Sequence, residues 1–193
     1  MQWFCRGGEG LSLLNSASRI PPKPGVYTLV IVVDNPVSIR VGSLGLLSFP
    51  KGVYAYTGSA LGKSVNLRNR LMRHLGSRAR LKWHIDYLLE AEDVRVEAVV
   101  FATTNRRAEC AVSKLILERL GREPVFRGFG SSDCREGCPT HLCFCGQADW
   151  LETASWIAHL YVEVGLFPTL IASALPEECG LANQATEASE SSS

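Results

Sequence analysis

The sequence predicts a single mixed α/β (α+β) domain, in which helices flank a small, mainly antiparallel sheet of three to four strands. Two observations carry this prediction. Short β-branched runs bounded by Gly, Pro and Asn alternate with segments whose apolar residues recur every three or four positions. In addition, 46% of the 193 residues are hydrophobic and 20% are charged, which provides for a packed core and excludes a globally disordered chain.

Four segments have the composition of β-strands. They cover residues 25–33, 38–41, 52–57 and 95–103. The first, GVYTLVIVV, is a β-branched run that ends at a turn, as expected for a buried strand. Because Asn35 and Pro36 are typical turn residues, we expect the first two strands to pair as an antiparallel hairpin. Residues 42–51 are expected to form a loop.

Four helices are expected, over residues 64–75, 83–90, 107–120 and 150–164. The first has a leucine every fourth residue, at Leu67, Leu71 and Leu75, and Gly76 suits the position after a helix C-terminus. An irregular, Cys-rich loop is expected between the third and the last helix.

The ends of the chain differ in composition from its centre. Residues 1–23 are rich in Gly, Ser and Pro and are expected to be a flexible lead-in. Residues 173–193 are small, polar and acidic and are expected to be a disordered tail. Between them we expect a folded domain at 24–146 and a helical extension at 147–172. The sequence shows neither a membrane-spanning apolar stretch nor a secretory signal, so we expect a soluble, cytoplasmic protein.

One segment is strongly basic although the net charge of the chain is only +1. Residues 63–82 contain seven cationic and no acidic side chains, namely Lys63, Arg68, Arg70, Arg73, Arg78, Arg80 and Lys82. A stripe of this kind is the electrostatic footprint that a nucleic-acid phosphate backbone requires. We therefore expect a nucleic-acid partner, and the sequence identifies no protein partner.

A cluster of cysteines follows the third predicted helix. It consists of Cys134, Cys138, His141, Cys143 and Cys145. Zinc needs four such ligands in tetrahedral geometry, usually as two pairs joined by a longer spacer. The pairs here are crowded, and Cys143 and Cys145 share one face of an extended segment. We therefore favour a disulfide or reduced core cysteines over a structural Zn²⁺ ion.

Side chains suited to phosphodiester chemistry gather around the third predicted strand. Tyr54 and Tyr56 share one face of that strand, and Tyr27 of the first strand converges with them if the two strands are neighbours. In the basic helix, Arg70 and His74 are four residues apart and share a face. This pair can bind a phosphate and still move a proton.

The second predicted helix carries a further group of aromatic and polar residues. Trp83 and Tyr87 are four residues apart, and we expect them to pack on the sheet. His84 and Asp86 are two apart and do not face each other on a helix. His84 can still reach the site, because the chain turns there from the basic helix.

The order of several short motifs resembles the GIY-YIG endonuclease superfamily. The motifs are GVY at 25–27, YTG at 56–58, R-x-x-R-H at 70–74 and a helical glutamate, Glu109. More narrowly, KGVYAYTGSALG, WHIDYLL, AECAV and GFGSSDC resemble a branch of archaeal proteins of unknown function, also found fused to bacterial endonuclease III. The resemblance covers roughly residues 24–144, so residues 24–146 are expected to form a GIY-YIG-like nuclease domain.

The resemblance implies a divalent-metal-dependent endonuclease that cleaves DNA, with branched or damaged DNA as the candidate substrate. It implies one Mg²⁺ or Mn²⁺ ion on Glu109, since these hard cations take few protein ligands and keep several waters. Arg70 matches the arginine that binds the scissile phosphate. Tyr27 and Tyr56 match the tyrosines that hold or deprotonate the attacking water. His74 matches a proton-transfer or phosphate-binding histidine.

Two other functions fit the same residues. A catalytically weak or inactive nucleic-acid-binding module would use the same basic stripe without turnover. A protein–protein adaptor would use the last helix and leave the basic stripe solvated. The asparagine that follows the glutamate in the nuclease family is replaced here by the segment GFGSSDC, in which Ser131, Ser132 or Asp133 would have to take its place.

Overall fold

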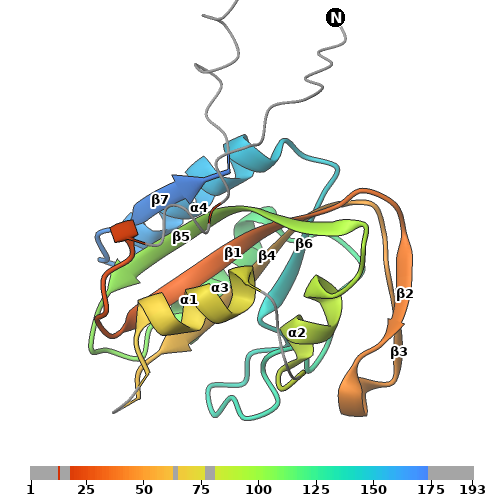
Figure 1. The fold of residues 1–193 in the computed structure, drawn as a ribbon, viewed down its shortest axis with the longest axis horizontal. Helices are drawn as coiled ribbons and strands as arrows, with labels where there is room; N and C mark the ends of the chain where they lie inside the picture. The colour runs from red at the N-terminus through yellow and green to blue at the C-terminus, as the bar shows by residue number, and fades with distance from the viewer. Residues whose placement is uncertain (1–12, 14–17, 63–64, 77–80, 174–193) are drawn as a thin grey trace, which may run out of the picture.

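A five-stranded antiparallel sheet forms the centre of the fold (Figure 1). The structure is a computed structural model, and it describes residues 13, 18–62, 65–76 and 81–173. The strands of the sheet are β1 (Gly25–Val33), β4 (Gly52–Ala60), β5 (Val94–Thr103), β6 (Leu142–Gly146) and β7 (Thr169–Ala172). They follow the order β6-β4-β1-β5-β7, and all neighbours are antiparallel. The predicted α+β class is confirmed, with five strands in place of three to four.

Two helices cover each face of the sheet (Figure 1). They are α1 (Leu67–Leu75) and α2 (His84–Leu89) on one face, and α3 (Glu109–Leu120) and α4 (Trp150–Glu163) on the other. Tyr27, Leu29 and Ile31 of β1 belong to the core under α1 and α2, whereas Val26 and Val30 belong to the core under α3 and α4. Because alternate residues of a strand face opposite sides, a strand covered on both faces is apolar throughout.

The predicted hairpin between residues 25–33 and 38–41 is wrong. β1 pairs over its full length with β4 on one side and with β5 on the other, so it has no free edge. β2 (Val37–Arg40) instead pairs with β3 (Leu46–Phe49) in a separate two-stranded sheet. A short 3₁₀ helix, η2 (Gly42–Leu44), joins these two strands, so the expected loop at 42–51 contains a strand of its own.

The remaining predicted elements are present with shifted boundaries. α1 begins at Leu67 rather than at residue 64, because the Asn66 side chain accepts a hydrogen bond from the backbone N–H of Asn69 and caps the helix. α3 begins at Glu109 rather than at residue 107. β6 and β7 were not predicted, and β6 lies where the sequence suggested an irregular loop. Both are edge strands of five and four residues, too short for a two-residue periodicity to be recognised.

The segment predicted as a helical extension, residues 147–172, belongs to the same layered structure. Ile157 and Leu160 of α4 lie in the core that α3 forms with the sheet. The Tyr161 hydroxyl lies 3.0 Å from the Oγ1 atom of Thr28 in the central strand. β7 then returns to pair with β5. The end of the described chain therefore completes the sheet.

The two ends expected to be flexible, residues 1–23 and 173–193, lie largely outside the described residues. Within the lead-in, Ile20 is buried, and its carbonyl accepts a hydrogen bond of 2.8 Å from the Nε of Arg68. None of the helices in the described part of the chain combines the length and the apolar character that crossing a bilayer demands.

The packing of α4 makes a testable prediction about stability. Ile157 is fully buried, so we expect Ile157→Ala to lower the free energy of unfolding by about 2–5 kcal/mol through lost contacts and a residual cavity. Val162, on the same helix, is 57% exposed, and Val162→Ala should change stability by less than about 0.5 kcal/mol. Urea denaturation followed by circular dichroism measures both. Equal effects at the two positions would contradict the packing of α4 against the sheet.

Candidate active site

A polar cavity of about 170 Å³ lies between α1, the start of α3 and the ends of β1 and β4. Its walls bring together the five residues that the sequence analysis assigned to chemistry, which are Tyr27, Tyr56, Arg70, His74 and Glu109. Trp83, Asp133 and His141 also line the cavity. The expected convergence of these side chains is therefore present, although their roles in chemistry stay a prediction.

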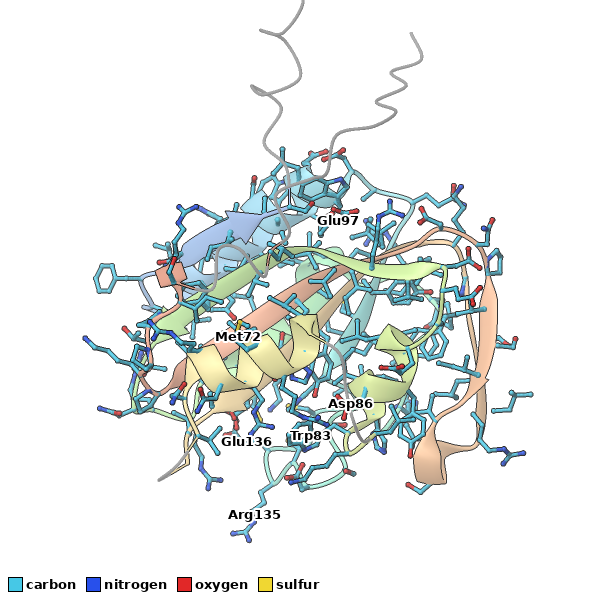
Figure 2. All side chains as sticks on the ribbon, viewed as in Figure 1. Met72, Trp83, Asp86, Glu97, Arg135 and Glu136 are labelled. Carbon is cyan, nitrogen blue, oxygen red and sulfur yellow. The ribbon has the colours of Figure 1, made fainter. Side chains whose placement is uncertain are left out.

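A second cavity of about 340 Å³ adjoins the first. The two share five lining residues, which are Ser59, Arg70, Glu109, Asp133 and His141. The larger one extends along the loop that follows α3, where Arg135 and Glu136 lie (Figure 2). Together they form one recess, with Arg70 of α1 on its cationic wall and the carboxylates of Glu109 and Asp133 on its acidic wall. Arg107 and Arg135 also line the larger cavity.

The strand register explains why the tyrosines meet. Tyr27 of β1 lies opposite Gly58 of β4, and Tyr56 lies two residues from Gly58 on the same strand. A Cβ atom on residue 58 would lie 2.5 Å from the Tyr27 hydroxyl, so only glycine leaves room for the phenol. The glycine of the YTG motif is thus a packing requirement of the neighbouring tyrosine.

A chain of polar contacts runs from the cavity into the protein. The Tyr27 hydroxyl lies 2.8 Å from His74 Nε2, and His74 Nδ1 lies 3.6 Å from Asp86 Oδ1. The latter distance is too long for a hydrogen bond but close enough for a charge interaction. The carboxylate favours a proton on Nδ1, so Nε2 is left to accept the hydrogen bond from the phenol. The result is a buried Tyr-His-Asp arrangement.

Several hydrogen-bond donors surround the Asp86 carboxylate. Its Oδ2 atom accepts hydrogen bonds from the backbone N–H groups of Lys82 at 2.8 Å and Trp83 at 3.0 Å, and Arg73 donates to the same oxygen. Burial acts to raise the pKa of Asp86, but the contacts with His74, these two backbone groups and Arg73 outweigh it and lower the pKa from 3.8 to about 2. Asp86 is therefore ionised at neutral pH.

Burial controls the ionisation of the remaining members. It raises the pKa of Tyr27 well above the ordinary value of 10.0, an effect that the neighbouring Tyr56 phenol increases. Burial also raises the pKa of Tyr56. It lowers the pKa of His74 below 6.5, against the opposing influence of Asp86. At neutral pH both phenols keep their protons, and the imidazole is uncharged and able to accept one.

Three cationic side chains gather around Trp83, and one of them, Arg70, lines the recess. The guanidinium carbons of Arg70 and Arg73 lie 4.2 and 4.4 Å from the centre of the Trp83 ring system, and the Lys82 ammonium lies at 5.0 Å. Trp83 directly precedes α2 and Asp86 lies in its first turn, where its side chain contacts α1 (Figure 2). Trp83 packs in part against the core, as expected, and also lines the cavity. Stacked guanidinium groups keep a defined orientation, which favours recognition of an oxyanion.

The acidic wall contains an unsatisfied oxygen. Glu109 Oε2 is buried and has no hydrogen-bond partner among the residues that the structure describes. Buried polar atoms are rarely left in this state, so a cation or a donor from a bound molecule is expected there. The Asp133 side chain lines the same two cavities.

The basic stripe is only partly available for binding. Arg68 donates to a backbone carbonyl and Arg73 is paired with Asp86, so both have structural partners inside the protein. Lys82 is exposed, and Arg70 lines the cavity. Three further members, Lys63, Arg78 and Arg80, lie outside the described residues.

The cysteine cluster differs from the predicted one. The structure brings Cys134, Cys138 and His141 together with Cys110 of α3, and their ligand atoms all lie within 4.8 Å of one another. This group can hold a metal ion. Cys143 and Cys145, which the sequence analysis included, lie on β6 in the core under α3 and α4. The five described cysteines are free, so of the two favoured alternatives the structure shows reduced cysteines and no disulfide among them.

The members of this group differ in acidity. Burial raises the pKa of Cys110 and of Cys138. Burial acts on Cys134 in the same direction, but hydrogen bonds from the backbone of Cys138 and Glu136 and from the Cys110 thiol outweigh it and lower the pKa. Burial lowers the pKa of His141, which keeps a lone pair available on the imidazole.

The protein therefore belongs to the class of α+β proteins with an antiparallel sheet covered by helices on both faces. It has a polar recess at one end of the sheet and a thiol-imidazole group beside that recess. The chain belongs to the family described as domain of unknown function DUF123, whose model matches residues 26–163. The match extends from β1 to α4 and includes every residue that lines the smaller cavity. No curated protein and no solved structure matches the chain.

The Asp86 contacts make a prediction about acid stability. Because the pKa of Asp86 is lower in the folded chain than its ordinary 3.8, its ionised form stabilises the fold above about pH 4, and this contribution is lost as the pH falls toward 2. We expect Asp86→Asn to be about 2 kcal/mol less stable than the wild type at pH 7. Between pH 4 and pH 2, the free energy of unfolding should fall less in the variant than in the wild type. Urea denaturation at a series of pH values measures this difference.

The matched control is Glu92→Gln, which removes a carboxylate from an exposed position near the end of α2. It should keep the pH dependence of the wild type. If Asp86→Asn also keeps that dependence below pH 4, the assigned role of Asp86 is wrong.

Proposed function

We propose that this protein is an endonuclease that uses a divalent metal ion to cleave phosphodiester bonds in DNA, with a site of the GIY-YIG type. The observation that carries the proposal is the 2.8 Å contact between the Tyr27 hydroxyl and His74 Nε2, with Asp86 behind it. This chain opens into a recess that also holds Arg70 and Glu109. The motif order supports the same assignment.

Arg70 is the residue best suited to bind the scissile phosphate. It forms no ion pair within the described part of the chain, and its guanidinium is stacked on Trp83. It lines both cavities, opposite the acidic wall. A phosphate bound there can receive two parallel hydrogen bonds from the guanidinium.

Tyr27 and His74 can remove the proton of an attacking water. Because the Tyr27 phenol is neutral, it cannot act as a preformed base. It can accept a proton from the water while its own proton passes to His74 Nε2. The imidazolium that forms is stabilised by the Asp86 carboxylate beside Nδ1. Tyr56, which faces the same cavity, is placed to donate a hydrogen bond to the water or to a phosphate oxygen.

Glu109 is the residue that would hold the metal ion. Its buried, unsatisfied oxygen fits a hard cation such as Mg²⁺ or Mn²⁺, and Asp133 adds a second carboxylate to the same recess. When bound, such an ion neutralises charge that develops on the phosphate and on the leaving oxygen. The protein contributes the carboxylate that fixes its position.

The second candidate function is a nucleic-acid-binding module without turnover. The observation that favours it is the gathering of Arg70 and Lys82 on Trp83, which suits phosphate binding and base stacking whether or not a bond is cleaved. Cleavage assays separate it from the nuclease, because both functions require binding and only one requires Glu109.

Removal of the Glu109 charge tests the nuclease directly. We expect wild-type protein to cleave duplex, nicked or branched DNA with Mg²⁺ or Mn²⁺, and Glu109→Gln to be slower by about two orders of magnitude or more. Glu118→Gln, at an exposed position of the same helix, should cleave like wild type. No cleavage by the wild type with either metal would exclude the nuclease and leave the binding module.

Binding through Arg70 is tested by its salt dependence. Loss of one phosphate contact in Arg70→Ala should weaken DNA binding and reduce the slope of log affinity against log salt by about 0.9. The control Arg40→Ala removes an exposed charge from β2, away from the recess, and should keep the wild-type slope. Fluorescence anisotropy in EDTA measures binding without cleavage. An unchanged slope in Arg70→Ala would mean that DNA does not contact this residue.

A further inference from the structure

Two parts of the chain that are distant in sequence supply the thiol-imidazole group. Cys110 lies in the first turn of α3, and Cys134, Cys138 and His141 lie in the loop that leads into β6. Three of the four residues are buried, and Cys134 is partly exposed. The group lies beside the recess, since Cys110, Cys134 and His141 also line its larger cavity.

The spacing of the donor atoms fits a single tetrahedral ion. With zinc–sulfur bonds of about 2.3 Å, two thiolates of a tetrahedral site lie about 3.8 Å apart. The Cys110 and Cys134 sulfurs are 3.4 Å apart, and Cys110 Sγ lies 3.8 Å from His141 Nε2. All four donor atoms fall within 4.8 Å of one another. An iron–sulfur cluster would require wider separation of the thiolates, because several metal atoms would lie between them.

Other uses of cysteine explain this group less well. A disulfide would require a sulfur–sulfur distance of about 2.05 Å and would leave a third thiol and an imidazole without a role. Cys143 and Cys145 provide a comparison within the same protein. Their sulfurs lie 3.9 Å apart in the apolar core, and each contacts a backbone carbonyl. Packing in an apolar core thus accounts for a pair of cysteines. It does not account for the group around Cys110, where a third thiol and an imidazole nitrogen converge with the first two thiols.

We propose that Cys110, Cys134, Cys138 and His141 bind one structural Zn²⁺ ion. The soft thiolates select zinc over the hard cations expected at Glu109. Binding converts the three thiols to thiolates and releases three protons, and the neutral imidazole coordinates through Nε2. Four protein ligands close the coordination shell, so the ion has no open position for substrate and its role is structural.

The zinc ion would link the two segments that carry the acidic wall. Glu109 directly precedes Cys110, and Asp133 directly precedes Cys134. Each of these two carboxylates is therefore one residue from a ligand. Hydrogen bonds also join these segments, for example those of 2.7 Å from Lys114 Nζ to the Glu136 carbonyl and of 3.1 Å from Ser113 Oγ to the Thr140 carbonyl. A shared ion would set the spacing of the two carboxylates.

Metal analysis of the full-length protein tests the proposal. Purified without chelators under reducing conditions, wild-type protein should contain about one equivalent of zinc, and Cys134→Ser should contain less than about a tenth of that. Cys134 is the natural position to change because it is the least buried ligand. Cys143→Ser, which alters a buried cysteine outside the group, should keep its zinc.

A second measurement does not depend on how a variant folds. Wild-type protein loaded with Co²⁺ should show the intense visible absorption of tetrahedral thiolate-bound cobalt, and Zn²⁺ should abolish that absorption. The proposal is overturned if reduced wild-type protein contains no zinc and takes up no Co²⁺, or if Cys134→Ser retains its zinc. It is also overturned if peptide mass spectrometry finds Cys110 and Cys134 joined as a disulfide in the native protein. Because none of these measurements uses DNA, they are independent of the proposed nuclease.

Discussion

The burial of one hydroxyl group determines how the site is assembled. Tyr27 is fully enclosed in the central strand, where an unpaired hydroxyl would cost about 1–3 kcal/mol. Its partner is His74 of α1, itself buried, and the next partner, Asp86, belongs to α2. Polar contacts thus connect the buried hydroxyl of the sheet to α1, and α1 to α2. α1 and α2 can occupy only positions that satisfy this chain, and the cationic wall follows from where they lie.

Much of the site could be predicted because its residues are tied to local patterns. Tyr27 and Tyr56 lie in strands whose composition identifies them, and Arg70 and His74 share a helix face that leucine spacing defines. Neighbouring antiparallel strands then bring the two phenols to one face of the sheet. Only the motif order predicts that Glu109 faces the same site as the tyrosines, and Glu109 does line the same recess.

The partners that sequence reasoning missed are defined by contacts between distant elements. The spacing of Asp86 on its own helix predicts no contact with His84 and gives no sign of its side-chain partners His74 and Arg73, which lie on the preceding helix. Cys110 is 24 residues from Cys134, too far for a spacing rule, and its only signal was its position beside Glu109. The sequence wrongly predicts that β2 pairs with β1, and it misses β3, because nothing local shows that both edges of β1 are occupied.

The distribution of strand lengths in the sheet has a consequence for the behaviour of the protein at high concentration. The three inner strands have nine or ten residues, whereas the two strands at the margins, β6 and β7, have five and four. A strand of another chain can form hydrogen bonds with the unpaired backbone groups of a marginal strand, and such pairing leads to aggregation. The long hydrophobic strands are enclosed, and the two marginal strands are too short to nucleate an extended intermolecular ladder.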